Sequence, residues 1–191
     1  MGTDLMSSRE PSLLEVARRS IEHGVATGDL LRLDVNDYPE SLRKPRATFV
    51  TLHHEGELRG CMGALEASRP LVSDVAHNAH AAAFRDPRFP PLPEAELRDL
   101  EIHLSILSPL ERLAVADESD LLRQLRPGID GLVLRNQTHH GTFLPSVWEG
   151  LAEPAEFVRQ LKRKAGLPQD DWSDDWEVLR YTVESIPRDA K

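Results

Sequence analysis

Cys61 is the only cysteine in the 191-residue chain, and Gly60 and Gly63 flank it. If residues 58–63 form a strand, the period-two alternation places Arg59 and Cys61 on the same face. A thiol reacts as its thiolate, which a nearby cation stabilises, and glycine in a strand often marks a close approach by a ligand or another backbone. This pattern predicts a nucleophilic cysteine with Arg59, Gly60 and Gly63 around a substrate. The alternative is a buried structural cysteine, a common environment for this residue.

His103 is the candidate general base for the thiol. It lies on the polar face of an alternating segment, 101–107, beside Ser105, and imidazole is the commonest side chain for proton transfer near neutral pH. No spacing in the sequence brings it to Cys61, so the alternative is a solvent-exposed or hydrogen-bonded strand histidine.

A proline-stiffened corner supplies the candidate anion site. Arg85, Asp86 and Arg88 surround Pro87, and two guanidinium groups there could clamp the carboxylate or phosphate of a small anionic substrate. The alternative is that Asp86 pairs with an arginine and fixes the corner.

The histidines do not predict a metal site. His77 and His80 are three residues apart on an expected helix, but no third ligand completes a zinc pattern. The pairs 53–54 and 139–140 are adjacent in sequence, and adjacent strand residues point to opposite faces.

Hydrophobic periodicity predicts helices and strands without regular alternation between them. The expected helices begin at Pro11 and end at Gly24, or cover 70–84, 121–125 and 154–165; the expected strands are 47–52, 58–63, 101–107, 132–134, 142–144 and 177–186, with a loop over 27–46. Consecutive hairpins favour antiparallel pairing, so the expected fold is α+β, a mainly antiparallel sheet flanked by helices.

Composition narrows the class of protein. With 40% hydrophobic and 29% charged residues, the chain is typical of one globular domain over residues 1–191, with a flexible start over 1–10. A net charge of −9 and a single basic cluster, at 159–164, argue against nucleic-acid binding. The single cysteine, with neither a signal peptide nor a long apolar run, predicts a cytoplasmic protein without a membrane span.

Several segments in order resemble the AMMECR-one domain family, known in bacteria and archaea as AmmeMemoRadiSam system protein A. They are Phe49–Leu52, Leu58–Gly63, Ala82–Pro91, Leu104–Pro109, Pro127–Gly131, Phe143–Trp148 and Lys164–Pro168. Met62 and Ser146 stand where Ile and Gln are usual. The resemblance implies two unequal lobes, with the Leu-Arg-Gly-Cys signature lining an interlobe cleft. It also implies association with a Memo-like protein related to extradiol dioxygenases and with a radical SAM protein, and it implies no particular cofactor or reaction.

Two functions therefore remain open from the sequence. One is a small-molecule enzyme, or a subunit of one, that uses Cys61. The other is a non-catalytic interaction module for the same partner proteins.

Overall fold

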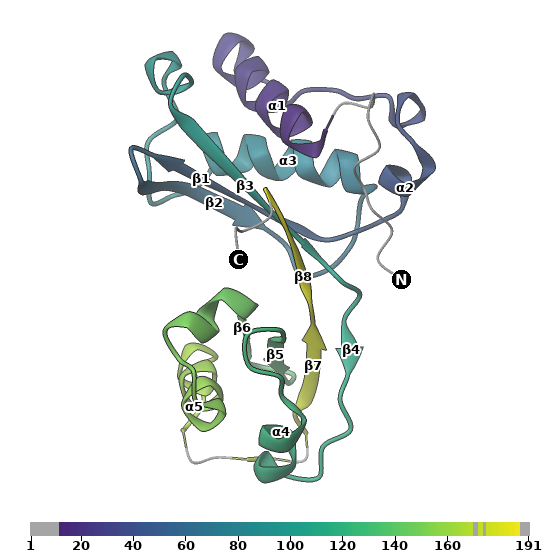
Figure 1. Ribbon diagram of the computed structural model, residues 1–191, viewed down its shortest axis with the longest axis vertical. Helices are drawn as coiled ribbons and strands as arrows, with labels where there is room; N and C mark the ends of the chain where they lie inside the picture. The colour runs from purple at the N-terminus through teal and green to yellow at the C-terminus, as the bar shows by residue number, and fades with distance from the viewer. Residues whose placement is uncertain (1–11, 170–171, 174, 188–191) are drawn as a thin grey trace. The chain divides into compact units, whose positions relative to one another are not determined.

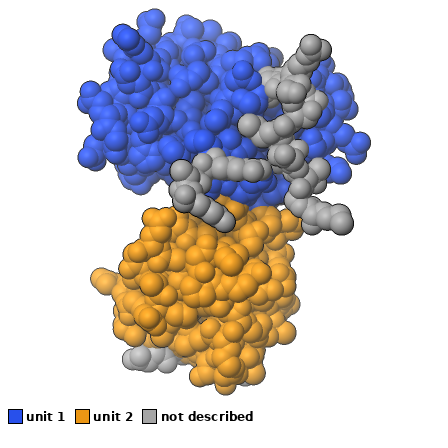
Figure 2. Space-filling model, viewed as in Figure 1, with its two compact units in different colours: residues 1–107, 184–191 blue, residues 108–183 orange. Residues whose placement is uncertain are grey.

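The computed structural model describes residues 12–169, 172–173 and 175–187. The chain forms two compact units (Figures 1 and 2): unit 1 comprises residues 1–107 and 184–191, and unit 2 comprises residues 108–183. The segment expected to be a flexible start lies outside the described residues. No helix in the described part of the chain is long and apolar enough to cross a membrane.

Unit 1 is a four-stranded sheet with helices on one face (Figure 1). The strand order is β2-β1-β3-β8, and β1 pairs antiparallel with both β2 and β3. The strands are β1 (Thr48–His54), β2 (Glu57–Gly63), β3 (Leu100–Leu107) and β8 (Val183–Ile186); the helices are α1 (Leu13–Thr27), α2 (Glu40–Arg43) and α3 (Leu71–Phe84), with 3-10 turns η1 (Val35–Asp37) and η2 (Glu94–Glu96).

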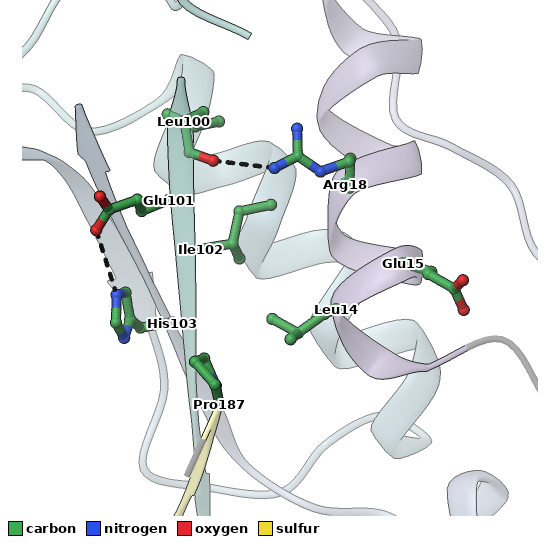
Figure 3. A pocket seen from close by; sticks show the side chains of 8 residues that line it. All are labelled: Leu14, Glu15, Arg18, Leu100, Glu101, Ile102, His103 and Pro187. Atoms are coloured by element: carbon green, nitrogen blue, oxygen red, sulfur yellow. Dashed lines mark hydrogen bonds and ion pairs between the residues drawn. The ribbon is translucent and has the colours of Figure 1, made fainter. Parts of the chain in front are cut away.

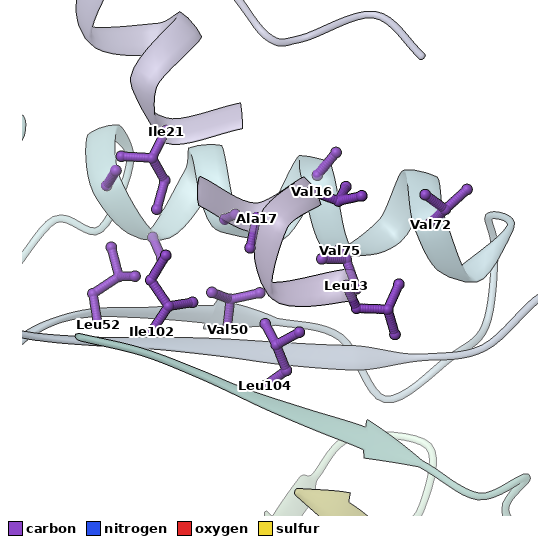
Figure 4. Packing of buried hydrophobic residues seen from close by; sticks show 14 of the residues in the cluster. Leu13, Val16, Ala17, Ile21, Val50, Leu52, Val72, Val75, Ile102 and Leu104 are labelled. Atoms are coloured by element: carbon purple, nitrogen blue, oxygen red, sulfur yellow. The ribbon is translucent and has the colours of Figure 1, made fainter. Parts of the chain in front are cut away.

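Alternation along the strands decides which face the helices cover. Val50 and Leu52 of β1 and Leu104 of β3 are fully or almost fully buried, and they pack against apolar side chains of α1 and α3 (Figure 4). Burying each such side chain contributes about 1.5–3 kcal/mol. Residues at the odd positions, such as Thr51 and His103, lie on the opposite face and are only partly buried.

Helix α1 begins and ends at recognisable caps. Ser12 accepts a hydrogen bond from the Glu15 amide while the Glu15 side chain accepts one from the Ser12 amide, and Gly28 closes the helix in a left-handed conformation. The expected end at Gly24 is therefore wrong. A Cβ at Gly24 would lie 2.3 Å from the Phe84 ring, so this glycine allows α1 and α3 to approach closely.

Unit 2 is a second four-stranded sheet, ordered β4-β7-β5-β6, whose pairs are antiparallel. Leu132 and Leu134 of β5 pack with α4 and α5, and the rings of Trp148 and Phe157 stack with centroids 3.8 Å apart. The elements are β4 (Glu111–Arg112), α4 (Glu118–Gln124), β5 (Gly131–Arg135), β6 (His140–Phe143), the 3-10 turn η3 (Pro145–Glu149), α5 (Pro154–Lys164) and β7 (Glu177–Tyr181).

The α+β class and the antiparallel hairpins are confirmed, with two corrections. The expected strand 177–186 is two strands, β7 and β8, which belong to different sheets and are separated at Thr182. The expected loop 27–46 contains the short helix α2 and a 3-10 turn. Alternation continues through Thr182, so the local pattern carries no sign that the chain changes sheets there.

Candidate functional site

Cys61 lies on β2, at the open edge of the unit 1 sheet, opposite Thr51 of β1. Its amide N–H donates to the Oδ2 atom of Asp86 at 2.9 Å, so it does not bond to β1. In an antiparallel pair, opposite residues that do not exchange backbone hydrogen bonds have the closest side chains. Accordingly, the Thr51 hydroxyl lies 3.3 Å from the Cys61 sulfur, and Cys61 is partly exposed.

Asp86 fixes this arrangement. Its side chain is only 2% exposed, and its two oxygens together accept from the amides of Cys61 and Arg88 and from Nε and Nη2 of Arg88. The Arg88 hydrogen bond is the main cause that holds the pKa of this carboxyl well below its usual range. A carboxylate has about four acceptor sites, so Asp86 has none left for a substrate and acts by positioning other groups.

Arg88 is the cation bound to the carboxylate that also holds the Cys61 amide. Its side chain is 54% exposed, and Asp86 occupies two of its five guanidinium N–H groups, at 3.0 and 2.7 Å. Hydrogen bonding to Asp86 raises the pKa of Arg88. The remaining N–H groups of Arg88 are a ready anion-binding edge.

Arg59 is held by Glu96 and by a backbone carbonyl, and its part in substrate binding stays a prediction. Its Nε donates to Glu96 at 2.6 Å, its Nη1 donates to the Pro90 carbonyl at 3.0 Å, and its side chain is 11% exposed. A register shift in the β1–β2 ladder skips Arg59, which has no paired residue on β1, and Glu96 neutralises its charge. Its ion pair instead joins β2 to the segment that leads into β3.

The glycines beside Cys61 are explained by neighbouring protein atoms. A Cβ at Gly60 would lie 2.1 Å from the Ala82 carbonyl of α3, and one at Gly63 would lie 2.4 Å from the Thr48 carbonyl. Both glycines therefore permit close backbone packing, and their roles in substrate binding stay a prediction.

His103 shares a row with the cysteine but is not its neighbour. On the face of the sheet turned away from α1 and α3, Cys61 of β2 lies opposite Thr51 of β1, and Thr51 lies opposite His103 of β3. Adjacent strands are about 4.8 Å apart, so a full strand separates the imidazole from the thiol. The His103 ring contacts the His53 ring at 5.2 Å between centroids, and its Nε2 lies 3.9 Å from Glu101.

Arg85 is exposed at the C-terminal end of α3, where its charge acts on His77 and His80. Burial is the main cause that lowers the pKa of His80, and Arg85 lowers it further. The part of Arg85 in substrate binding stays a prediction.

No cluster of His, Cys, Asp or Glu in the described ranges could hold a metal ion. The basic cluster of α5 is also less exposed than its sequence indicates. Lys162 is fully buried, donates to Glu118 and to the Gln169 carbonyl, and lies 5.7 Å from the ring centroids of both Trp172 and Trp176. These tryptophans pack around a buried cation.

Thr51 and Glu96 are site residues that the sequence did not predict. Thr51 carried no usable signal, because pairing counted from the turn at Gly56 places Val50 opposite Cys61, and a register shift between Leu52 and His53 brings Thr51 there instead. Glu96 carried none, because its pairing with Arg59 spans 37 residues and joins irregular backbone to a strand.

Comparison with known proteins covers nearly the whole chain. The AMMECR1 family model matches residues 14–186. A protein of Methanothermobacter thermautotrophicus is 37% identical over 183 residues, covering 94% of both chains, and one of Thermotoga maritima is 41% identical over 171 residues, covering 88% of this chain and 92% of its own. An uncharacterized protein from Pyrococcus horikoshii, known from a crystal structure, superposes with a TM-score of 0.81 at 33% identity, over 91% of this chain and 88% of its own.

Proposed function

The chain belongs to the AMMECR1 family, and on this premise we propose that it is a small-molecule enzyme, or the subunit of one, that uses Cys61 on an anionic substrate. One observation carries the proposal: the Asp86 carboxylate binds the Cys61 amide and the Arg88 guanidinium at the same time. A partly exposed thiol and a half-exposed cation are thereby held around one rigid group. Such pre-organisation is what a nucleophile and its substrate anchor require.

The division of roles follows from the contacts. Cys61 supplies the nucleophilic sulfur, and the Thr51 hydroxyl is the polar group nearest to it. Arg88 binds the substrate anion through the N–H groups that Asp86 leaves free. Asp86 is a positioning residue for both.

Two alkylating reagents of nearly equal shape test this site without knowledge of the substrate. Iodoacetate carries a carboxylate, and iodoacetamide does not. We expect the iodoacetate-to-iodoacetamide rate ratio at Cys61 to exceed that of free cysteine about fivefold at low salt, and the excess to fall at high ionic strength. Arg88→Gln should abolish the excess, whereas Arg126→Gln in unit 2 should preserve it. Equal ratios in the wild-type protein and Arg88→Gln would remove the anion site from the proposal.

The family relation is also the basis for proposing the partners, a Memo-like protein and a radical SAM protein. The alternative, a non-catalytic interaction module, calls for an exposed apolar surface, and the large hydrophobic residues exposed in the described chain are Leu30, Leu58 and Ile129, which are far apart in the sequence. Cys61→Ser distinguishes the two functions. The enzyme loses function in cells while it still co-purifies with its partners, and the module loses neither.

A further inference from the structure

A groove in unit 1 lies between α1 and the first half of β3, apart from the Asp86 corner. It has a volume of about 470 Å³, and Leu14, Arg18, Ile102, His103 and Pro187 are among its lining residues. Figure 3 shows Leu14 and Ile102 pointing into the space between the helix and the strand, with Arg18 at one end and Pro187 at the other. This size and this largely apolar wall are typical of sites for small organic ligands.

Arg18 gives the groove its chemical character. Its Nη1 donates to the Leu97 carbonyl at 3.2 Å and its Nη2 to the Leu100 carbonyl at 2.9 Å, so the guanidinium is fixed against the end of β3. Both acceptors are neutral, and among residues 12–169, 172–173 and 175–187 no carboxylate forms an ion pair with Arg18. This partly buried charge differs from those of Arg59 and Arg88, which Glu96 and Asp86 neutralise.

Neither of the two acidic residues that line the groove is the carboxylate partner of Arg18. Glu15 accepts the Ser12 amide in the helix cap and points away from the groove in Figure 3. Glu101 lies on the other side of β3, beside His103. An anion that enters between α1 and β3 would therefore meet the guanidinium before either carboxylate.

We propose that this groove is a second ligand site, which binds a small amphipathic carboxylate. The carboxylate pairs with the free N–H groups of Arg18, and the apolar part of the ligand lies along Leu14 and Ile102 toward Pro187. A charge-assisted hydrogen bond fixes the orientation, and apolar burial supplies affinity. The site uses neither Cys61 nor Arg88, so it goes beyond the function proposed above.

The probe for this site is octanoate, with 1-octanol as the neutral control of the same chain length. In the wild-type protein, titration followed by 1H–15N NMR should saturate, and the shifts should be confined to amides of 14–18 and 100–103. Octanol should bind at least tenfold more weakly. Absence of saturation, or shifts centred on 59–63 and 86–89, would overturn the proposal.

Substitutions then identify the cation. Arg18→Gln should weaken octanoate binding at least tenfold, because it removes the charge but keeps a donor for the β3 carbonyls, and Arg18→Lys should lose less. Arg88→Gln is the matched control and should bind octanoate as the wild type does. If Arg88→Gln weakens binding and Arg18→Gln does not, the carboxylate belongs at the cysteine site, and this proposal fails while the proposed function stands.

Discussion

Two turns of this protein each contain a buried aspartate paired with a half-exposed arginine, but the two pairs have different roles. In unit 1, buried Asp86 pairs with Arg88, and in unit 2, buried Asp130 pairs with Arg126; the arginines are 54% and 49% exposed. Asp130 takes its remaining hydrogen bond from the Arg126 amide, within the same turn. Asp86 takes one from the amide of Cys61, on a strand 25 residues away. The Asp130–Arg126 pair therefore stabilises its own turn, whereas the Asp86–Arg88 pair also positions the thiol of Cys61.

Arg126→Gln should produce the largest loss of stability. The substitution leaves a fully buried carboxylate without its cation, and removing one partner of such a pair costs about 3 kcal/mol. Urea unfolding would measure the loss. Arg123→Gln is the control, because its pair with Asp120 is exposed at the arginine, and it should change stability by less than about 0.5 kcal/mol. A loss below 1 kcal/mol for Arg126→Gln would show that the turn does not depend on the pair.

Arg88→Gln should cost less, about 2 kcal/mol, because the Asp86 carboxylate keeps the Cys61 amide as a donor from outside its own turn. The same urea measurement applies, with the exposed Arg85→Gln as control. If Arg88→Gln and Arg126→Gln were equally destabilising, the bond to Cys61 would add nothing to the Asp86 corner, and the contrast between the corners would disappear.

The smallest expected effect is on the pH dependence of folding stability in acid. Because the pKa of Asp86 is lowered in the folded state, the unfolded chain takes up its proton first as pH falls. The stabilisation is complete above about pH 4, the usual pKa of Asp, and is lost as pH falls below it toward the folded-state pKa. Arg88→Gln brings that pKa closer to its usual value and should flatten this part of the pH dependence.

Unfolding free energies of the wild type and Arg88→Gln between pH 5 and pH 3 would test this. His80, whose buried imidazole also has a lowered pKa, is present in both proteins, so its contribution cancels in the difference. Parallel curves for the two proteins would show that Arg88 does not set the ionisation of Asp86.

Local patterns predicted most of the elements that hold the site. The apolar stripe of α3, the alternation of β3 and the β1–β2 hairpin follow from side-chain periodicity. The register shift that places Cys61 opposite Thr51 does not. Periodicity could not predict which side chain each arginine pairs with.

The sequence predicted three arginines near the cysteine segment as anion-binding residues on equal grounds, and only tertiary contacts distinguish them. Arg59 pairs with Glu96, Arg88 pairs with Asp86, and Arg85 acts on the histidines of α3. The arginine closest in sequence to the thiol is therefore paired with a carboxylate of another segment. The same limit applies to Thr182, where the chain changes sheets within an unbroken alternation.

The placement of β8 has a consequence for how the protein is made. The fourth strand of the unit 1 sheet, β8, is completed by residues 184–186, which are synthesised after all of unit 2, and until then β3 lacks this neighbour. On the ribosome, the strands of unit 2 are therefore complete before those of unit 1, although unit 1 begins first. Such late pairing between distant segments slows folding, and it leaves one edge of β3 open to other extended chains in the meantime.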